Sequence, residues 1–183
     1  ESEPVKKFNN ARWEETNMVY PLSQADEWLK TNICIVSYGD IFYYPNIVND
    51  LISNSDDIAI AYDVNWKALW TARFEDPLSD AETFAIDENN IVTEIGKRAE
   101  CIDKIQGQYM GLIRISPNGW STMINFLSTL EQEIFDKLDV TSLLQHLILL
   151  EEKIRGVPNT KPWGEIDFPQ DMAIYEQFLA DGR

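Results

Sequence analysis

Two short acidic motifs carry the side chains that could do chemistry in this sequence. Tyr38-Gly39-Asp40 ends an apolar run, and Trp163-Gly164-Glu165-Ile166-Asp167 lies between two predicted helices. A hard cation such as Mg²⁺ usually takes one or two protein carboxylates and completes its shell with water and substrate phosphate. Asp40 and Asp167 would form a metal-triphosphate site if the fold brings them together. Spacing alone leaves an alternative, in which Asp40 caps the segment after its strand and Asp167 caps the last helix.

The segments around Asp40 indicate how it is positioned. Ile33 to Tyr38 is short, apolar and rich in β-branched residues, which is typical of a strand buried on both faces. A stretch with helical spacing comes after Pro45, and Ile58 to Tyr62 is a second apolar run. This order predicts a strand-helix-strand unit of a parallel sheet. Ligands of such sheets bind beyond the carboxyl ends of the strands, where Asp40 and Asp63 would both lie.

The rest of the chain predicts an α/β fold, with a mostly parallel sheet and one antiparallel excursion around 84–115. We expect one domain over residues 1–183, because the sequence has no internal repeat and no glycine- or serine-rich linker. The elements expected from periodicity and capping are helices over 23–30, 65–73, 120–138 and 140–148 and from Pro169, a hairpin joining 84–86 to 91–95, and a strand over 109–115.

The composition argues against several classes of protein. The chain has 31 Asp and Glu against 15 Lys and Arg, and its longest basic run is Lys6-Lys7, whereas binding a nucleic-acid backbone requires clustered cations. Cys34 and Cys101 have no second thiol or imidazole at zinc-ligand spacing. No apolar run reaches the roughly 20 residues that span a bilayer, and no signal peptide is recognisable. We therefore expect a cytoplasmic protein without a membrane or nucleic-acid partner; a homo-oligomer stays open.

Aromatic residues accompany the acids near the predicted strand ends. Trp70, Tyr109 and Trp163 lie in or beside connecting segments, where Asp63 and Glu165 could supply a counter-charge. Aromatic faces beside a carboxylate bind ammonium groups, at roughly 0.5 to 2 kcal/mol per contact. The alternative is that these rings pack in the core or form a wall.

Several of these segments resemble one enzyme family. Ile33 to Phe42, Ile91 to Lys97 and Trp163 to Asp171 are similar, in this order, to the nucleotidyltransferases that activate sugar 1-phosphates, phosphocholine and phosphonates. The bacterial phosphocholine cytidylyltransferase-like branch is the most similar, and the likeness runs from about Asn17 onward. It implies a Rossmann-like, GT-A-like three-layer sandwich, of which this sequence covers the C-terminal three quarters.

The resemblance also implies roles for individual residues. Asp40 and Asp167 match the aspartates that hold the catalytic Mg²⁺, and Glu165 would lie in the same pocket. Lys97 matches a lysine that commonly contacts the phosphate of the acceptor. The family opens with a strand and a glycine-rich loop that carries an arginine, and then a Lys-Pro segment, and the position of this loop would precede Glu1.

The implied reaction is the transfer of a nucleotidyl group from a nucleoside triphosphate to a small acceptor. The expected group is CMP, and the expected acceptor is a phosphate or phosphonate such as phosphocholine, which attacks the α-phosphorus in line and releases pyrophosphate. No protein nucleophile is needed, and His146, the one histidine, lies on a leucine-rich helix. The alternatives are a sugar-1-phosphate nucleotidyltransferase and a noncatalytic transferase-like binding protein, which an absent glycine-rich loop would favour.

Overall fold

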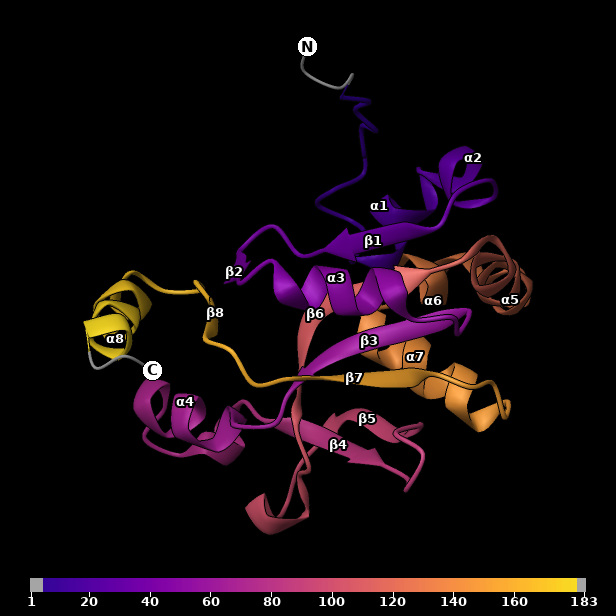
Figure 1. Ribbon diagram of the computed structural model, residues 1–183. Coiled ribbons are helices and arrows are strands. Elements are labelled where there is room, and N and C mark those ends of the chain that lie inside the picture. The colour runs from indigo at the N-terminus through magenta and orange to yellow at the C-terminus, as the bar shows by residue number, and fades with distance from the viewer. Residues whose placement is uncertain (1–4, 181–183) are drawn as a thin grey trace.

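The computed structural model describes residues 5–180, which place helices around a central sheet (Figure 1). The strands are β1 (Cys34–Ser37), β2 (Ile41–Tyr43), β3 (Ile58–Asp63), β4 (Glu82–Ile86), β5 (Val92–Arg98), β6 (Gln108–Ile115), β7 (Arg155–Asn159) and β8 (Trp163–Glu165). The helices are α1 (Val19–Ser23), α2 (Asp26–Leu29), α3 (Asn46–Ser53), α4 (Trp66–Arg73), α5 (Pro117–Leu127), α6 (Gln132–Lys137), α7 (Val140–Leu149) and α8 (Pro169–Ala180). Two 3-10 helices, η1 (Pro77–Ser79) and η2 (Ile102–Lys104), lie in connections.

The central sheet has the strand order β1-β6-β3-β7. β3 and β7 pair in parallel, whereas β6 runs antiparallel to both β1 and β3. Three of these four strands, β1, β3 and β7, therefore point the same way. Their carboxyl ends lie together at one end of the strands, on the left in Figure 1. The expected α/β fold, with a mostly parallel set of strands and one antiparallel excursion, is confirmed.

Helices cover both faces of this sheet and make three layers. α3 lies on one face, and α5 and α7 lie on the other (Figure 1). Every residue of β3 is buried, and in β6 all but Tyr109 are buried. Apolar burial contributes about 25 cal/mol per Å². This two-sided core therefore fixes the strands whose ends carry the acidic residues.

Two smaller sheets complete the fold. β4 and β5 form the predicted hairpin, which is anchored to α7 because the Ile95 N–H donates to Gln145 Oε1 at 3.0 Å. β2 and β8 pair antiparallel, with Ile41 opposite Glu165. The second pairing joins the segment after β1 to the segment after β7.

The predicted strand-helix-strand unit differs from the structure in two respects. β1 and β3 run in the same direction, but β6 is inserted between them, so they are not neighbours. β1 is also only half-buried, because it lies at the end of the sheet, and the expectation of burial on both faces is wrong for this strand. The carboxyl ends of both strands nevertheless reach the same edge of the sheet.

Two predicted helices are each divided in the structure. The 23–30 segment contains the last residue of α1 and all of α2, and Ser23 Oγ donates to the Tyr20 carbonyl at 2.6 Å instead of capping α2. The long helix expected over 120–138 breaks between α5 and α6, where Ser128 and Thr129 donate to carbonyls three residues earlier. Such local hydrogen bonds compete with helix continuation.

Two short strands, β7 and β8, were not predicted. Gly156 and Pro158 are residues typical of the end of a helix, yet both lie within β7. Proline is tolerated there because β7 is the last strand of its sheet, so one edge of its backbone needs no partner. β8 was expected to be an irregular segment between two helices, and its pairing with β2 is what carries Glu165 into the site.

Candidate active site

Three carboxylates meet beyond the carboxyl ends of the central strands. Asp40, Glu165 and Asp167 each offer an oxygen atom, and these atoms all lie within 4.8 Å of one another. The β2–β8 pairing brings them together, since Asp40 directly precedes β2, and the Ile166 N–H donates to its carbonyl at 3.0 Å. Asp40 and Asp167 are exposed, and Glu165 is partly buried. The convergence expected from the two acidic motifs is thus present in the fold.

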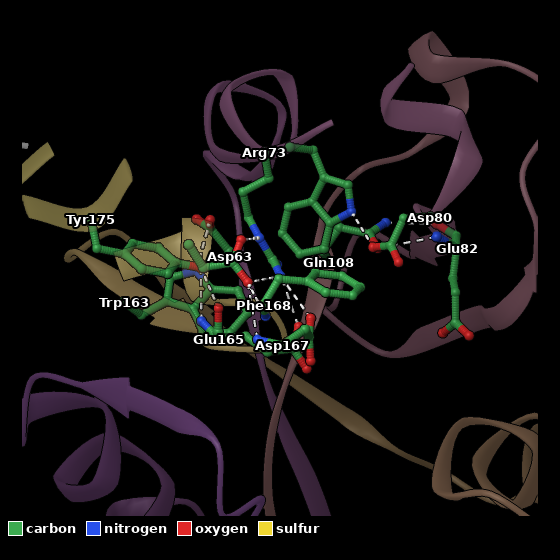
Figure 2. Close-up of polar contacts among 12 residues, drawn as sticks. Asp63, Arg73, Asp80, Glu82, Gln108, Trp163, Glu165, Asp167, Phe168 and Tyr175 are labelled. Carbon is green, nitrogen blue, oxygen red and sulfur yellow. Dashed lines mark hydrogen bonds and ion pairs between the residues drawn. The ribbon is translucent and has the colours of Figure 1, made fainter. Parts of the chain in front are cut away.

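A buried arginine lies behind these acids. Arg73 ends α4, its side chain is only 1% exposed, and Figure 2 shows it reaching toward Glu165 and Asp167. Its Nη2 donates to Asp167 Oδ2 at 2.7 Å, and its Nη1 lies 3.5 Å from Glu165 Oε2. Its Nε donates to Asp171 Oδ1 at 3.2 Å. A single guanidinium therefore contacts three carboxylates and partly offsets their mutual repulsion.

Helix α8 fixes the backbone that carries the acids. Asp171 Oδ2 accepts the N–H groups of Asp167 and Phe168 at 3.0 and 2.9 Å. Tyr175 packs its ring against Gly164 so closely that a Cβ there would come within 2.3 Å of it. Glycine is therefore required at position 164, and the 164–168 segment is held from one side by a single helix.

The charge state of Glu165 differs from that of a free carboxyl. Burial, together with repulsion from Asp167 and Asp40, raises the pKa of Glu165 to about 7, although Arg73 opposes this shift. Asp171 behaves in the opposite way, because the backbone N–H of Phe168 and the Arg73 guanidinium outweigh its burial and lower its pKa. The site thus holds more negative charge than its own cation neutralises, which favours an external cation.

A cavity of about 450 Å³ adjoins the acids. Glu165 and Asp167 line one part of it, and Asp80, Glu82 and Asp139 line another. Further lining residues are aromatic, namely Tyr38, Trp70, Phe84, Tyr109 and Phe168. None of the described residues that line it is Lys or Arg. This cavity is therefore an acidic space with aromatic walls, suited to a cation.

The acids and the rings of this cavity are held in place by hydrogen bonds. Trp70 Nε1 donates to Asp80 Oδ2 at 2.9 Å, and the side chain of Gln108 bonds both the N–H and the carbonyl of Glu82 (Figure 2). Burial, with repulsion from Asp139, raises the pKa of Glu82. Glu82 makes no ion pair within residues 5–180. The backbone of Glu82 is thus fixed, and its carboxylate lacks a positive partner among the described residues.

Comparison with known proteins identifies the family. The CTP:phosphoglutamine cytidylyltransferase of Campylobacter jejuni is 35% identical to this chain over 178 residues, which cover 91% of this chain and 70% of the relative. The chain belongs to the nucleotidyltransferase family, as a cytidylyltransferase-like member. No protein-family model matches it.

Solved structures of nucleotidyltransferases have the same fold. The inositol-1-phosphate CTP transferase of T. maritima matches with a TM-score of 0.66 at 16% identity, over 91% of this chain and 62% of that one. A putative glucose-1-phosphate thymidylyltransferase of Bacillus anthracis matches with a TM-score of 0.68 at 10% identity, over 90% and 61%. This chain thus spans less than two thirds of these structures. Within residues 5–180, none of its helices combines the length and apolarity needed to cross a bilayer.

The other residues predicted for the site lie at different places around the carboxylate cluster. Trp70 and Tyr109 line the acidic cavity, and the Tyr109 hydroxyl is buried without a hydrogen-bond partner among the described residues. Asp63 and Trp163 are hydrogen-bonded to each other at 2.9 Å and line a different cavity of about 340 Å³. Their contact with a substrate stays a prediction.

Lys97 lies in β5 of the β4–β5 hairpin. Its ammonium group is exposed and lies 3.2 Å from Glu94 Oε1. It lines a third cavity, of about 410 Å³, which shares Thr83 and Phe84 with the acidic cavity. The structure therefore does not bring Lys97 into contact with the three clustered acids, and its role at the acceptor phosphate stays a prediction.

Several residues around the carboxylate cluster and the acidic cavity were not expected from the sequence. Arg73, Asp80 and Glu82 are not among the site residues expected from the sequence. A usable signal was present for Arg73, because it lies on the same predicted helix as Leu69 and Trp70, four and three positions away. Residues at this spacing share a helix face, so a charged member of that face would be buried and would need partners.

Proposed function

We propose that this protein is a Mg²⁺-dependent cytidylyltransferase that transfers CMP from CTP to a small phosphorylated or phosphonate acceptor bearing an ammonium group, and releases pyrophosphate. Phosphocholine is the acceptor proposed first. The observation that carries the proposal is the meeting of Asp40, Glu165 and Asp167 within 4.8 Å beside an acidic cavity. CTP is favoured because the 35%-identical relative is named for it.

The clustered acids fit the ion that the proposal requires. Carboxylate oxygens are the ligands that Mg²⁺ prefers, and one or two of them suffice when substrate phosphates complete the shell. Asp40 and Asp167 would hold the ion, and Glu165 lies beside them. When bound, Mg²⁺ neutralises negative charge that develops on the phosphoryl oxygens.

The transfer itself requires no covalent bond between the substrate and the protein. An oxygen of the acceptor's phosphate forms a bond to the α-phosphorus, the bond from that phosphorus to the bridging oxygen of the β-phosphate breaks, and pyrophosphate leaves. Both reactants are anions, so positioning and charge compensation dominate the barrier. The residues of this chain would hold the reactants in line and need not act as a nucleophile.

The lining of the cavity supports an acceptor that carries positive charge. Glu82, Asp80 and Asp139 lie beside Trp70 and Phe84, and this combination of carboxylates and ring faces suits a quaternary or primary ammonium. Glu165 is proposed to contribute at the boundary with the metal site. Lys97 is proposed to contact the acceptor's phosphate from the neighbouring cavity, around Thr83.

A pyrophosphate-release screen of the full-length protein tests the function. CTP, UTP, dTTP, ATP and GTP are each paired with phosphocholine, phosphoglutamine, aminoethylphosphonate and glucose 1-phosphate, with Mg²⁺ or with EDTA. Release with CTP and an ammonium-bearing acceptor, lost in EDTA, is the expected result. A preference for glucose 1-phosphate would favour the sugar-1-phosphate alternative, and no release with any pair would favour a noncatalytic protein.

Two matched variants test the metal ligands. Asp40→Asn and Asp167→Asn remove one charge each at nearly constant volume, and each should reduce Mg²⁺-dependent release by at least about 100-fold. Asp103→Asn, at an exposed acid on η2 away from the cluster, is the control and should retain activity. Full activity in either cluster variant would refute its assignment as a ligand.

A further inference from the structure

Arg73 is the one cation within residues 5–180 that pairs with Glu165 and Asp167 of the cluster and with Asp171 of α8. Its side chain is 1% exposed, and its guanidinium lies near the rings of Trp70 and Phe74, at 5.8 and 5.1 Å from the centroids. A fully buried guanidinium is too remote from solvent to serve as a first contact for a free phosphate. Its surroundings point instead to a role toward the carboxylates that it contacts.

Arg73 contacts Glu165 in β8 and Asp167 in the turn after β8 in different ways. Its Nη2 hydrogen bond of 2.7 Å occupies Oδ2 of Asp167 and leaves Oδ1 as the free oxygen of that carboxylate. Its Nη1 is 3.5 Å from Glu165, which is the separation of an ion pair, and Nη1 has no hydrogen-bond partner among the described residues. The guanidinium therefore fixes Asp167 more tightly than Glu165.

Asp171 extends this restraint to the backbone. It accepts from Nε and Nη2 of Arg73 at 3.2 and 3.3 Å, and its Oδ2 also accepts the N–H of Asp167. The side chain and the main chain of Asp167 are consequently held by the same pair of residues. A planar guanidinium can bridge two carboxylates in this way, whereas a lysine ammonium cannot reproduce the fork.

We propose that Arg73 is a positioning residue, which fixes the orientation of Asp167 and thereby makes the carboxylate cluster select Mg²⁺ over the larger Ca²⁺. The inference rests on the proposed function, in which Asp40 and Asp167 hold the metal ion. Mg²⁺ demands a near-ideal octahedral arrangement, whereas Ca²⁺ accepts more ligands in irregular geometry. A loosened Asp167 therefore weakens the binding of Mg²⁺ more than that of Ca²⁺.

The ratio of the Mg²⁺ and Ca²⁺ affinities distinguishes an effect of Arg73 on the position of Asp167 from an effect of its positive charge alone. Removing a positive charge beside the carboxylates changes the attraction of both divalent ions alike, so it leaves the ratio of their dissociation constants unchanged. A misplaced oxygen changes that ratio. General loss of folded protein also affects both ions equally and leaves the ratio unchanged.

The test measures binding of Mg²⁺ alone and of Ca²⁺ alone to the full-length protein by titration calorimetry. Arg73→Met should lower the preference for Mg²⁺ by about tenfold or more, because changing the partner of a metal ligand typically costs 10- to 100-fold in affinity. Arg73→Lys should lower it as well. Arg155→Met is the matched control, since Arg155 pairs with Asp56 at 2.8 Å outside the cluster, and it should keep the wild-type ratio.

Each outcome decides the proposal. If Arg73→Met fails to fold, Arg73→Lys carries the test, and a lowered ratio in a folded variant supports positioning. A wild-type ratio in a folded Arg73 variant overturns it, while Mg²⁺ binding by the wild-type protein leaves the proposed function standing. If the wild-type protein binds neither ion, or Asp40→Asn binds Mg²⁺ as well as wild type, the proposed metal site fails and this inference fails with it.

Discussion

The hydroxyl of Tyr175 makes two hydrogen bonds with the backbone of Glu165. It accepts from the Glu165 N–H at 2.9 Å and donates to the Glu165 carbonyl at 2.8 Å. A residue in the middle of α8 thus satisfies both backbone groups of a residue in β8 on the edge that β2 does not cover. Since β8 is only three residues long, this clamp is a large part of what holds the acid in place.

Tyr175→Phe is expected to destabilise the protein. The substitution keeps the ring that packs against Gly164 but removes both hydrogen bonds, so the free energy of unfolding should fall by about 1 to 3 kcal/mol. Urea denaturation monitored by circular dichroism measures the change. Tyr44→Phe, at a tyrosine that is 50% exposed, should change the stability by less than about 0.5 kcal/mol. Equal stabilities of the two variants would contradict the clamp.

Stability without metal should depend on the charge of Glu165. The folded-state pKa of about 7 exceeds the ordinary value of 4.5, so the native protein binds more protons than the unfolded chain between these values. Its free energy of unfolding therefore falls as the pH rises from 4.5 to about 7, and the penalty stays constant above that. Glu165→Gln should remove the penalty, on the order of 1 to 2 kcal/mol.

Thermal unfolding in EDTA at pH 5 and pH 8 measures this effect. Glu165→Gln should melt at a higher temperature than wild type at pH 8, and the gap should shrink toward pH 5. Added Mg²⁺ should stabilise the wild type at pH 8 and narrow the gap, because an ion that binds only the native state raises its stability. A Glu165→Gln variant that is less stable than wild type at pH 8 in EDTA would show that the ionised Glu165 carboxylate does not destabilise the folded protein.

The two tryptophans near the acids should respond differently to substitution. Trp70→Leu removes a ring from the acidic cavity, so the KM for an ammonium-bearing acceptor should rise roughly 2- to 30-fold, with a smaller change for CTP. Trp163→Leu leaves the buried Asp63 without its 2.9 Å donor, so we expect mainly a loss of stability, of about 2 kcal/mol or more. An equal rise in acceptor KM would instead support the predicted substrate contact of Trp163.

The position of Asp40 could be predicted because strand ends are local features. An apolar run that ends in Gly39-Asp40 indicates where β1 stops, and the carboxyl ends of parallel strands collect at one edge of a sheet. The β4–β5 hairpin and the N-cap at Asp139, which accepts from the Ser142 N–H at 2.6 Å, arise from similarly local chemistry. These elements needed no knowledge of distant contacts.

The features that were missed depend on contacts between distant segments. Pro158 resembles a helix terminator until the sheet order places β7 at an edge, and the three residues of β8 are too few to show a period of two. The partners of Arg73 lie more than 90 positions away, so neither its burial nor its charge neutralisation is visible in the local sequence. Specific polar networks of this kind can be identified only when the tertiary fold is known.

Glu82 offers the sharpest test of what the acidic cavity binds. Its backbone is fixed by Gln108, and its carboxylate accepts a long contact of 3.5 Å from Thr141 Oγ1. No cation among the described residues offsets its charge. Glu82→Gln preserves the shape and that contact while removing the charge. At pH 8, the KM for an ammonium-bearing acceptor should rise roughly tenfold, which corresponds to about 1.4 kcal/mol.

An acceptor without an ammonium group and a distant glutamate give this prediction its controls. The KM for glucose 1-phosphate should stay the same or fall in Glu82→Gln, because the substitution removes a negative charge near an anionic substrate. Glu133→Gln, at an exposed position of α6, should leave both KM values unchanged. Steady-state pyrophosphate release with each acceptor separates the cases. If Glu82→Gln raises the KM of the two acceptors by the same factor, Glu82 contributes to the shape of the cavity and does not interact with the ammonium group of the acceptor.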